Sequence, residues 1–168
     1  TANTYTVTAN ANGGIIPATN GWTVAQGSQT ATKTVTYDSA YGTLPIPTRT
    51  GYAFGGWYTG ENGTGTEITQ DTIVEEKQEI TLYAKWVVAI NYYNGTTLVR
   101  STARTYGETR NLETIQELGI SDEEYPNFYG WGLSNNTLER TYTDGQSLSL
   151  TSEEGGEINL YAIWNREA

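Results

Sequence analysis

The sequence lacks three residue types that carry much of protein chemistry, because it contains no cysteine, no histidine and no methionine. Without cysteine and histidine there is no thiol nucleophile, no imidazole general base and no zinc or haem ligand set of the usual kinds. A disulfide framework is excluded for the same reason. We therefore expect a protein that is not an enzyme and that has no catalytic residues, no cofactor and no metal site.

Positive charge is also scarce. Nine Lys and Arg residues stand against 19 Asp and Glu, which gives a formal net charge of -10. Nucleic acid partners require a basic patch that displaces counterions from phosphates, so we expect no nucleic acid partner. No apolar run approaches the length of a membrane-spanning helix, and we expect no membrane insertion within these residues.

The residues that are present favour β-structure. Aromatic residues make up 12% of the chain, with 13 Tyr and 5 Trp, and Thr and Gly are abundant. Tyr, Trp and Thr suit a pleated, half-buried surface, while Gly suits tight turns. The composition predicts a mostly β protein, α+β at most.

Two pairs of similar segments recur in the same order along the chain. GYAFGGW at 51–57 precedes ITLYAKW at 80–86, and YPNFYGW at 125–131 precedes INLYAIW at 158–164. Such self-similarity is typical of repeat architectures. It predicts two tandem modules, residues 1–87 and residues 88–168, that have diverged through loop insertions.

The predicted junction between the modules contains no linker sequence. From Trp86 the chain continues Val87-Val88-Ala89-Ile90, without the Gly, Pro or Ser run that a flexible linker needs. We expect a stiff, end-to-end connection and a fixed, elongated pair of modules.

Alternation identifies the strand that ends each copy. Ile80, Leu82, Ala84 and Trp86 fall on one face of a predicted strand, which is the period-2 pattern of a half-buried strand. The second copy repeats this alternation over 158–164.

Phe54 and Trp57 are three residues apart and cannot share a face of a regular strand. The two glycines between them predict a β-bulge or a close backbone approach.

The copies differ in the crossover between their strands. The first uses Pro45 and Pro47, which favour an extended path, whereas the second has an apolar stripe within residues 111–119. Asn111 as the N-cap and Gly119 at the C-terminus would complete a short helix over the sheet. A hairpin, a crossover and further strands are the order of a β-grasp, or ubiquitin-like, module.

The motifs of the first copy resemble the Listeria-Bacteroides repeat, the family that includes the B-repeats of internalins. They are Tyr-x-Val-x4-Asn-Gly-Gly from Tyr5, Pro-x-Arg-x-Gly-Tyr-x-Phe-x-Gly-Trp from Pro47, and Leu-Tyr-Ala-Lys-Trp from Leu82. The second copy lacks the Pro-x-Arg-x-Gly-Tyr segment that precedes the Phe-x-Gly-Trp motif, and it resembles a divergent member of this family. The resemblance implies a β-grasp-like module on bacterial cell-surface proteins, including adhesins, and brings no general set of catalytic residues.

Four aromatic residues outside the recurring Trp and Phe positions are candidates for exposed binding residues: Trp22, Tyr58, Tyr93 and Tyr129. They could form a platform for sugar rings or for a partner protein. The competing interpretation for Trp22 is an extra packing strand, and for the three tyrosines it is pairing across strands of an exposed sheet.

Carboxylates cluster at Glu75-Glu76, at Asp122-Glu123-Glu124 and at Glu153-Glu154. A glycosidase needs only two well-spaced carboxylates, but these clusters lie in polar, loop-like surroundings that would not raise a carboxyl pKa. We interpret them as solvated loops, and none has the spacing of a calcium-binding loop.

Two functional hypotheses follow. The first is a non-catalytic repeat region of a bacterial cell-surface or secreted protein, which acts as a stiff spacer and as an interaction or adhesion module for a host or bacterial surface protein. The alternative is a carbohydrate-binding module of a secreted glycan-degrading protein, with Trp22, Tyr58 and Tyr93 as stacking residues. Both place the chain outside the cell.

Overall fold

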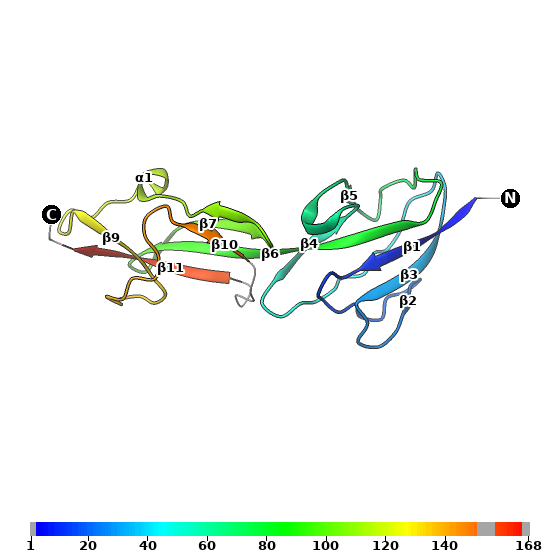
Figure 1. Cartoon of the computed structure of the whole chain (residues 1–168), viewed down its shortest axis with the longest axis horizontal. Helices are drawn as coiled ribbons and strands as arrows, with labels where there is room; N and C mark the ends of the chain where they lie inside the picture. The colour runs from blue at the N-terminus through cyan, green and yellow to red at the C-terminus, as the bar shows by residue number, and fades with distance from the viewer. Residues whose placement is uncertain (1–2, 151–156, 166–168) are drawn as a thin grey trace. The chain divides into compact units, whose positions relative to one another are not determined.

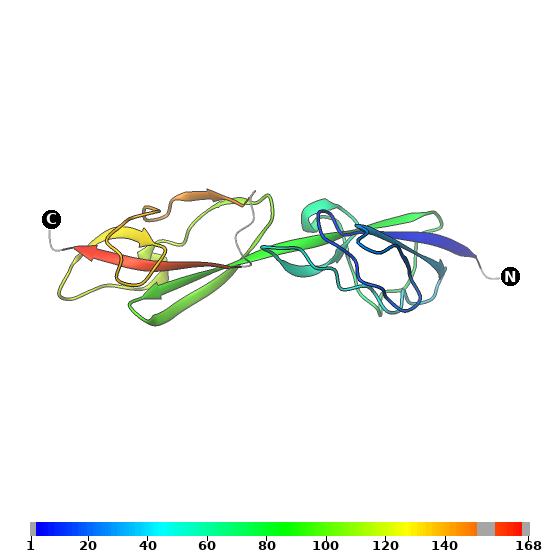
Figure 2. The same cartoon turned by 90° about the horizontal axis from the view of Figure 1, so that it is seen from below.

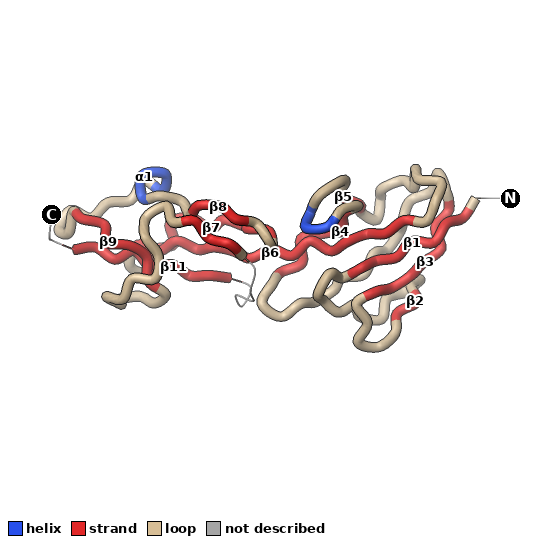
Figure 3. Tube along the Cα trace, viewed as in Figure 1, coloured by secondary structure: helices blue, strands red, loops and turns tan. Residues whose placement is uncertain are grey.

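The protein is mostly β, as its composition predicts. The computed structural model describes residues 3–150 and 157–165, and Figure 3 shows strands and loops through nearly all of them. Within these ranges, helical structure is confined to the four-residue helix α1 (Ile115–Leu118) and the 3₁₀ turn η1 (Glu61–Gly63). Neither is long or apolar enough to cross a membrane.

The chain folds as two compact units, Thr1–Val87 and Val88–Ala168. The first unit contains one mixed sheet, in which the order of neighbouring strands is β2-β3-β1-β6-β4-β5. These strands are β1 (Thr4–Asn10), β2 (Thr23–Val24), β3 (Thr30–Thr36), β4 (Ala53–Tyr58), β5 (Glu67–Ile68) and β6 (Ile80–Asn94). Strand β1 lies between its antiparallel partner β3 and the parallel strand β6, and β4 is antiparallel to β6 (Figure 1).

The bulge predicted between Phe54 and Trp57 is present in β4. Phe54 is opposite Trp86 and Trp57 is opposite Ala84, with a register shift between the two pairs. Gly56 has a φ of 113°, a conformation that favours glycine. The extra residue allows Phe54 and Trp57 to contact each other although they are three positions apart.

The alternation predicted for residues 80–86 continues to the end of β6. Every second side chain is buried from Ile80 through Trp86, and the same pattern runs on through Val88 and Ile90 to Tyr92. Strand β6 therefore provides core side chains to both units, through residues 80–87 in the first and 88–94 in the second.

The second unit repeats the strand arrangement of the first, in the order β7-β6-β11-β9. Its strands are the second part of β6, β7 (Thr97–Thr105), β9 (Asn127–Gly132) and β11 (Glu157–Asn165). Strand β11 is parallel to β6 and antiparallel to β9, just as β6 is parallel to β1 and antiparallel to β4 in the first unit. Strands β8 (Thr109–Asn111) and β10 (Ser147–Ser149) form a separate two-stranded sheet, and Figure 2 gives a second view of both units.

The helix of the second unit is shorter than predicted. Asn111 does not cap it, because Asn111 belongs to β8 and pairs with Ser147 of β10. Thr114 is the N-cap instead, and it forms a capping box with Glu117. Gly119 ends the helix in the left-handed conformation, at a φ of 68°.

Loop residues close the core over one face of each sheet. The buried strand side chains include Val7, Leu82 and Trp57 in the first unit and Ile90, Leu160 and Trp131 in the second. The buried loop side chains include Ile16, Tyr41 and Val74 in the first unit and Leu112 and Leu150 in the second.

Candidate functional site

The recurring aromatic residues of the first unit pack into a close cluster. Phe54 stands edge-on to Trp57 and Trp86, with ring centroids 5.5 and 5.9 Å apart. Both indoles are 2% exposed, and both donate buried hydrogen bonds to carbonyl oxygens, Trp57 to Pro45 at 2.9 Å and Trp86 to Ala11 at 2.7 Å. The two indoles serve the core and offer no surface to a ligand, whereas Phe54 is partly exposed.

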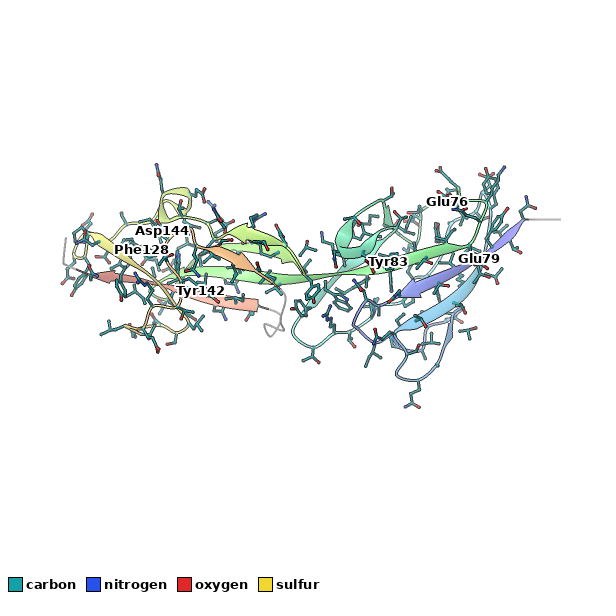
Figure 4. The ribbon with its side chains drawn as sticks, viewed as in Figure 1. Glu76, Glu79, Tyr83, Phe128, Tyr142 and Asp144 are labelled. Atoms are coloured by element: carbon teal, nitrogen blue, oxygen red, sulfur yellow. The ribbon has the colours of Figure 1, made fainter. Side chains whose placement is uncertain are left out.

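The second unit contains the same three-ring cluster, with one difference. Phe128, labelled on β9 in Figure 4, stands edge-on to Trp131 and Trp164, and both centroid distances are 5.1 Å. Trp131 is fully buried, whereas Trp164 is partly exposed. The indole N–H of Trp164 donates to the side-chain oxygen of Asn94 at 3.0 Å. Phe128 is partly exposed, as Phe54 is, so the difference between the two clusters lies at the tryptophan: Trp164 is partly exposed where Trp86 is buried.

Trp22, the first of the four predicted binding residues, is buried. Its side chain is 8% exposed, and its indole N–H donates to the Thr43 carbonyl at 2.8 Å. The ammonium of Lys33 lies 6.0 Å from the ring centroid. Trp22 therefore packs within the first unit and is not an exposed aromatic.

Tyr58 and Tyr93 already have close neighbours. Tyr58 is partly exposed, with the ammonium of Lys85 lying 5.5 Å from its ring centroid. Tyr93 stacks on Tyr161 of the neighbouring strand β11, with centroids 4.8 Å apart and ring planes 14° apart. The stacking of Tyr93 matches the cross-strand pairing considered as the competing interpretation.

Tyr129 is the most exposed of the four, at 41%, and the guanidinium of Arg140 lies 4.4 Å from its ring centroid. Trp22 and Tyr58 belong to the first unit, whereas Tyr93 and Tyr129 belong to the second. The four residues are therefore divided between the two units.

A charged cluster that the sequence analysis did not single out lies in the second unit. Arg104 is 2% exposed, and its guanidinium lies 2.7 Å from the carboxylate of Glu113. The hydroxyl of the buried Tyr92 also donates to that carboxylate. Burial alone would raise the pKa of Glu113, but hydrogen bonds from Tyr92 and from its own backbone, together with Arg104, lower the pKa below its usual value. This arrangement is a buried structural ion pair.

The predicted acidic clusters do not form a metal centre in the part of the chain that the structure describes. Among residues 3–150 and 157–165, no three Asp or Glu side chains are grouped closely enough to hold a metal ion. Glu75 and Glu76 are exposed, and the carboxylate of Asp122 accepts hydrogen bonds from the backbone N–H groups of Glu124 and Tyr125. Glu153 and Glu154 lie outside the described residues.

Open grooves occur in both units. In the first unit, a groove of about 390 Å³ is lined mainly by threonines of β1, β2 and β3. In the second, a groove of about 660 Å³ lies between the turn at Asn94 and Gly95, the loop of residues 134–138 and Trp164. We call the latter the Trp164 groove. The alternation over 158–164 predicted that Trp164 lies on the buried face of its strand, and a comparison of what covers the equivalent tryptophan in each copy would have revealed the difference.

Comparison with known protein families identifies the first unit. Residues 5–85 match the family model of the Listeria-Bacteroides repeat domain, which confirms the resemblance drawn from the motifs at Tyr5, Pro47 and Leu82. None of the curated proteins compared with the chain is similar enough to count as a match. Repeats of this family are found in bacterial surface proteins. Residues 5–85 therefore form a Listeria-Bacteroides repeat domain.

Proposed function

We propose that the chain is a non-catalytic tandem repeat region of a bacterial cell-surface or secreted protein, acting as a stiff spacer and as an interaction or adhesion module. The observation that carries this proposal is the match of residues 5–85 to a repeat family that occurs in bacterial surface proteins. The absence of Cys and His from the sequence supports a role without catalysis. The partner in this proposal is a protein on a host or bacterial surface.

In this proposal, the second unit is a divergent copy of the same repeat, and both copies are β-grasp modules. The parallel neighbours β1 and β6 in the first unit and β6 and β11 in the second support this assignment. A cluster of one Phe and two Trp rings in each unit supports it as well.

The stiffness of the spacer would come from the way the chain passes from one unit to the next. The boundary between Val87 and Val88 falls inside strand β6, so no loop residue separates the two units in sequence. A strand with β-branched residues at the boundary has less backbone freedom than a Gly- or Ser-rich linker.

Residual dipolar couplings of the two units test this role directly. Backbone N–H couplings are measured on the full chain in a dilute aligned medium, and an alignment tensor is fitted to each unit separately. We expect the two tensors to agree in magnitude and orientation. A control variant carries a Gly-Ser-Gly-Ser insertion between Val87 and Val88, and its two tensors should diverge. Divergent tensors in the unmodified chain would contradict a stiff spacer.

A further inference from the structure

The Trp164 groove is open because the second copy lacks the backbone segments that cover Trp86, the equivalent of Trp164, in the first copy. Gly14 packs directly on the buried ring of Trp86, since a Cβ atom added to Gly14 would overlap the Cζ2 atom of that ring. The same added Cβ atom would lie 2.8 Å from the carbonyl oxygen of Thr48, which belongs to the proline-containing segment before β4. Backbone from two segments thus seals the ring of Trp86.

The second copy does not keep either of these covering segments unchanged. In the sequence, the motif Asn12-Gly13-Gly14 aligns with Asn94-Gly95-Thr96, so the second copy has no second glycine after its Asn-Gly pair. The Pro-x-Arg-x-Gly-Tyr segment is also missing. Trp164 is consequently partly exposed and lines an open groove of about 660 Å³.

The position of the Trp164 ring is well defined. Its indole N–H is held by the side-chain oxygen of Asn94 at 3.0 Å, and the ring of Phe128 packs against it edge-on. An aromatic ring whose orientation is fixed before binding costs little conformational entropy when a ligand stacks on it.

Two loops that form the walls of the groove are also held in place. A Cβ atom added to Gly132 would overlap the methyl group of Thr137, so the loop of residues 134–138 packs closely on β9. Asn136 adopts a φ of 65° in this loop. On the other side, Asp122 accepts hydrogen bonds from the backbone N–H groups of Glu124 and Tyr125 at 2.9 and 2.8 Å. The groove is therefore largely preformed, as small-molecule sites usually are.

The chemistry of the lining restricts the class of ligand. Among the described residues, Asn94, Asn135, Asn136 and Ser134 supply amide and hydroxyl groups, and neither Lys nor Arg lines the groove. Asp122 adds negative charge, which disfavours phosphates and carboxylated sugars. Apolar contact comes from the ring of Trp164, from Leu138, which is 85% exposed, and from Tyr125, Ala162 and Ile163.

We propose that the Trp164 groove binds a neutral oligosaccharide, whose sugar ring stacks on Trp164 while its hydroxyl groups bond to the asparagine and serine side chains. An aromatic face surrounded by neutral hydrogen-bonding groups matches the alternating apolar and hydroxyl surfaces of a sugar ring. The volume of the groove, about 660 Å³, falls within the range of about 300–1,000 Å³ that is typical of ligand sites. Such a site is independent of the spacer role and uses none of the four aromatics predicted from the sequence.

The test is a titration of the ¹⁵N-labelled full chain with four neutral probes: cellotriose, maltotriose, mannotriose and triacetylchitotriose. Trigalacturonate serves as an anionic comparison. We expect at least one neutral trisaccharide to shift the indole N–H signal of Trp164 in a saturable manner, and trigalacturonate to bind more weakly. If none of the four neutral sugars shifts this signal up to its solubility limit, the proposal is wrong.

Two variants identify the residues that contact the sugar. Trp164→Ala should weaken binding by about tenfold or more, which corresponds to about 1.4 kcal/mol. Because Trp164 also packs on Phe128, Leu138→Ala provides a second variant whose side chain is too exposed to support the fold. Its affinity should fall several-fold, whereas the control Leu98→Ala, at a side chain that is 51% exposed on β7, should bind like the unmodified chain. Equal binding by Leu138→Ala and Leu98→Ala would overturn the proposed site.

Discussion

Replacing Glu113 with glutamine removes the negative charge from the buried cluster of the second unit while keeping a side chain of nearly the same shape. Arg104 is 2% exposed and lies 2.7 Å from the Glu113 carboxylate. It also donates to the carbonyl of Asn111 at 3.2 Å, and that bond survives the substitution. Glu113→Gln therefore leaves a buried guanidinium with a hydrogen bond but without its counter-ion.

The expected loss of stability is large for a single substitution. Breaking a buried ion pair from one side costs about 3–5 kcal/mol, since the remaining charge stays buried and uncompensated. The surviving bond to Asn111 and the acceptor oxygen of the new glutamine place Glu113→Gln near the lower end, at about 3 kcal/mol. Adding Arg104→Met removes the stranded charge, so the double variant should be more stable than Glu113→Gln alone.

The same carboxylate should make the second unit sensitive to acid. The pKa of Glu113 in the folded protein is below its ordinary value of 4.5, so its ionised form stabilises the fold. This contribution is complete above that ordinary value and is lost as the pH falls through the lowered pKa of the folded state. Glu113→Gln should remove this part of the acid-induced loss of stability.

Native-state hydrogen exchange on the full chain measures these effects in the second unit alone. The slowest amides of β11 report the free energy of opening of that unit. The control is Glu108→Gln, whose carboxylate lies 3.5 Å from the half-exposed Arg110 and should contribute about 1 kcal/mol or less. If Glu113→Gln costs no more than Glu108→Gln, or if the double variant is the least stable of the series, the role assigned to the buried pair is wrong.

Three further substitutions test other parts of the fold by urea denaturation. Gly14→Ala should destabilise the first unit by about 1–3 kcal/mol, because the new methyl group would overlap the ring of Trp86; an unchanged midpoint would contradict this packing. Trp22→Phe should cost about 1–2 kcal/mol through loss of the hydrogen bond to Thr43 and of buried ring area, and no loss at all would mean that Trp22 is exposed. Thr114→Ala should cost about 0.5–2 kcal/mol by removing the cap of α1, whereas Thr114→Ser should retain most of the stability.

Local sequence patterns predicted much of the fold. Alternation from Ile80 to Trp86 predicted the buried face of β6, and the two glycines before Trp57 predicted the bulge in β4. These features depend on neighbouring residues, whose periodicity and turn chemistry are visible in the sequence. Asn111 was misassigned because its pairing with Ser147 depends on a strand far along the chain.

The side-chain environments were harder to predict because they depend on distant segments. Arg104 of β7 and Glu113, which follows β8, are nine positions apart and meet Tyr92 of β6 only when all three segments are folded together. Trp22 has no counterpart in the second copy, so the repeat pattern gave no information about its burial. Trp164 occupies the same motif position as Trp86, and its exposure follows from the loss of segments that lie elsewhere in the chain.

The most direct test of the account concerns the second unit, whose strand arrangement repeats that of the matched family domain. Nuclear Overhauser effects between backbone protons of β6 and β11 distinguish parallel from antiparallel pairing. We expect the parallel pattern, with Ile158 beside Ile90 and Leu160 beside Tyr92. An antiparallel pattern, or no contact between β6 and β11, would show that the second unit is not a copy of the repeat.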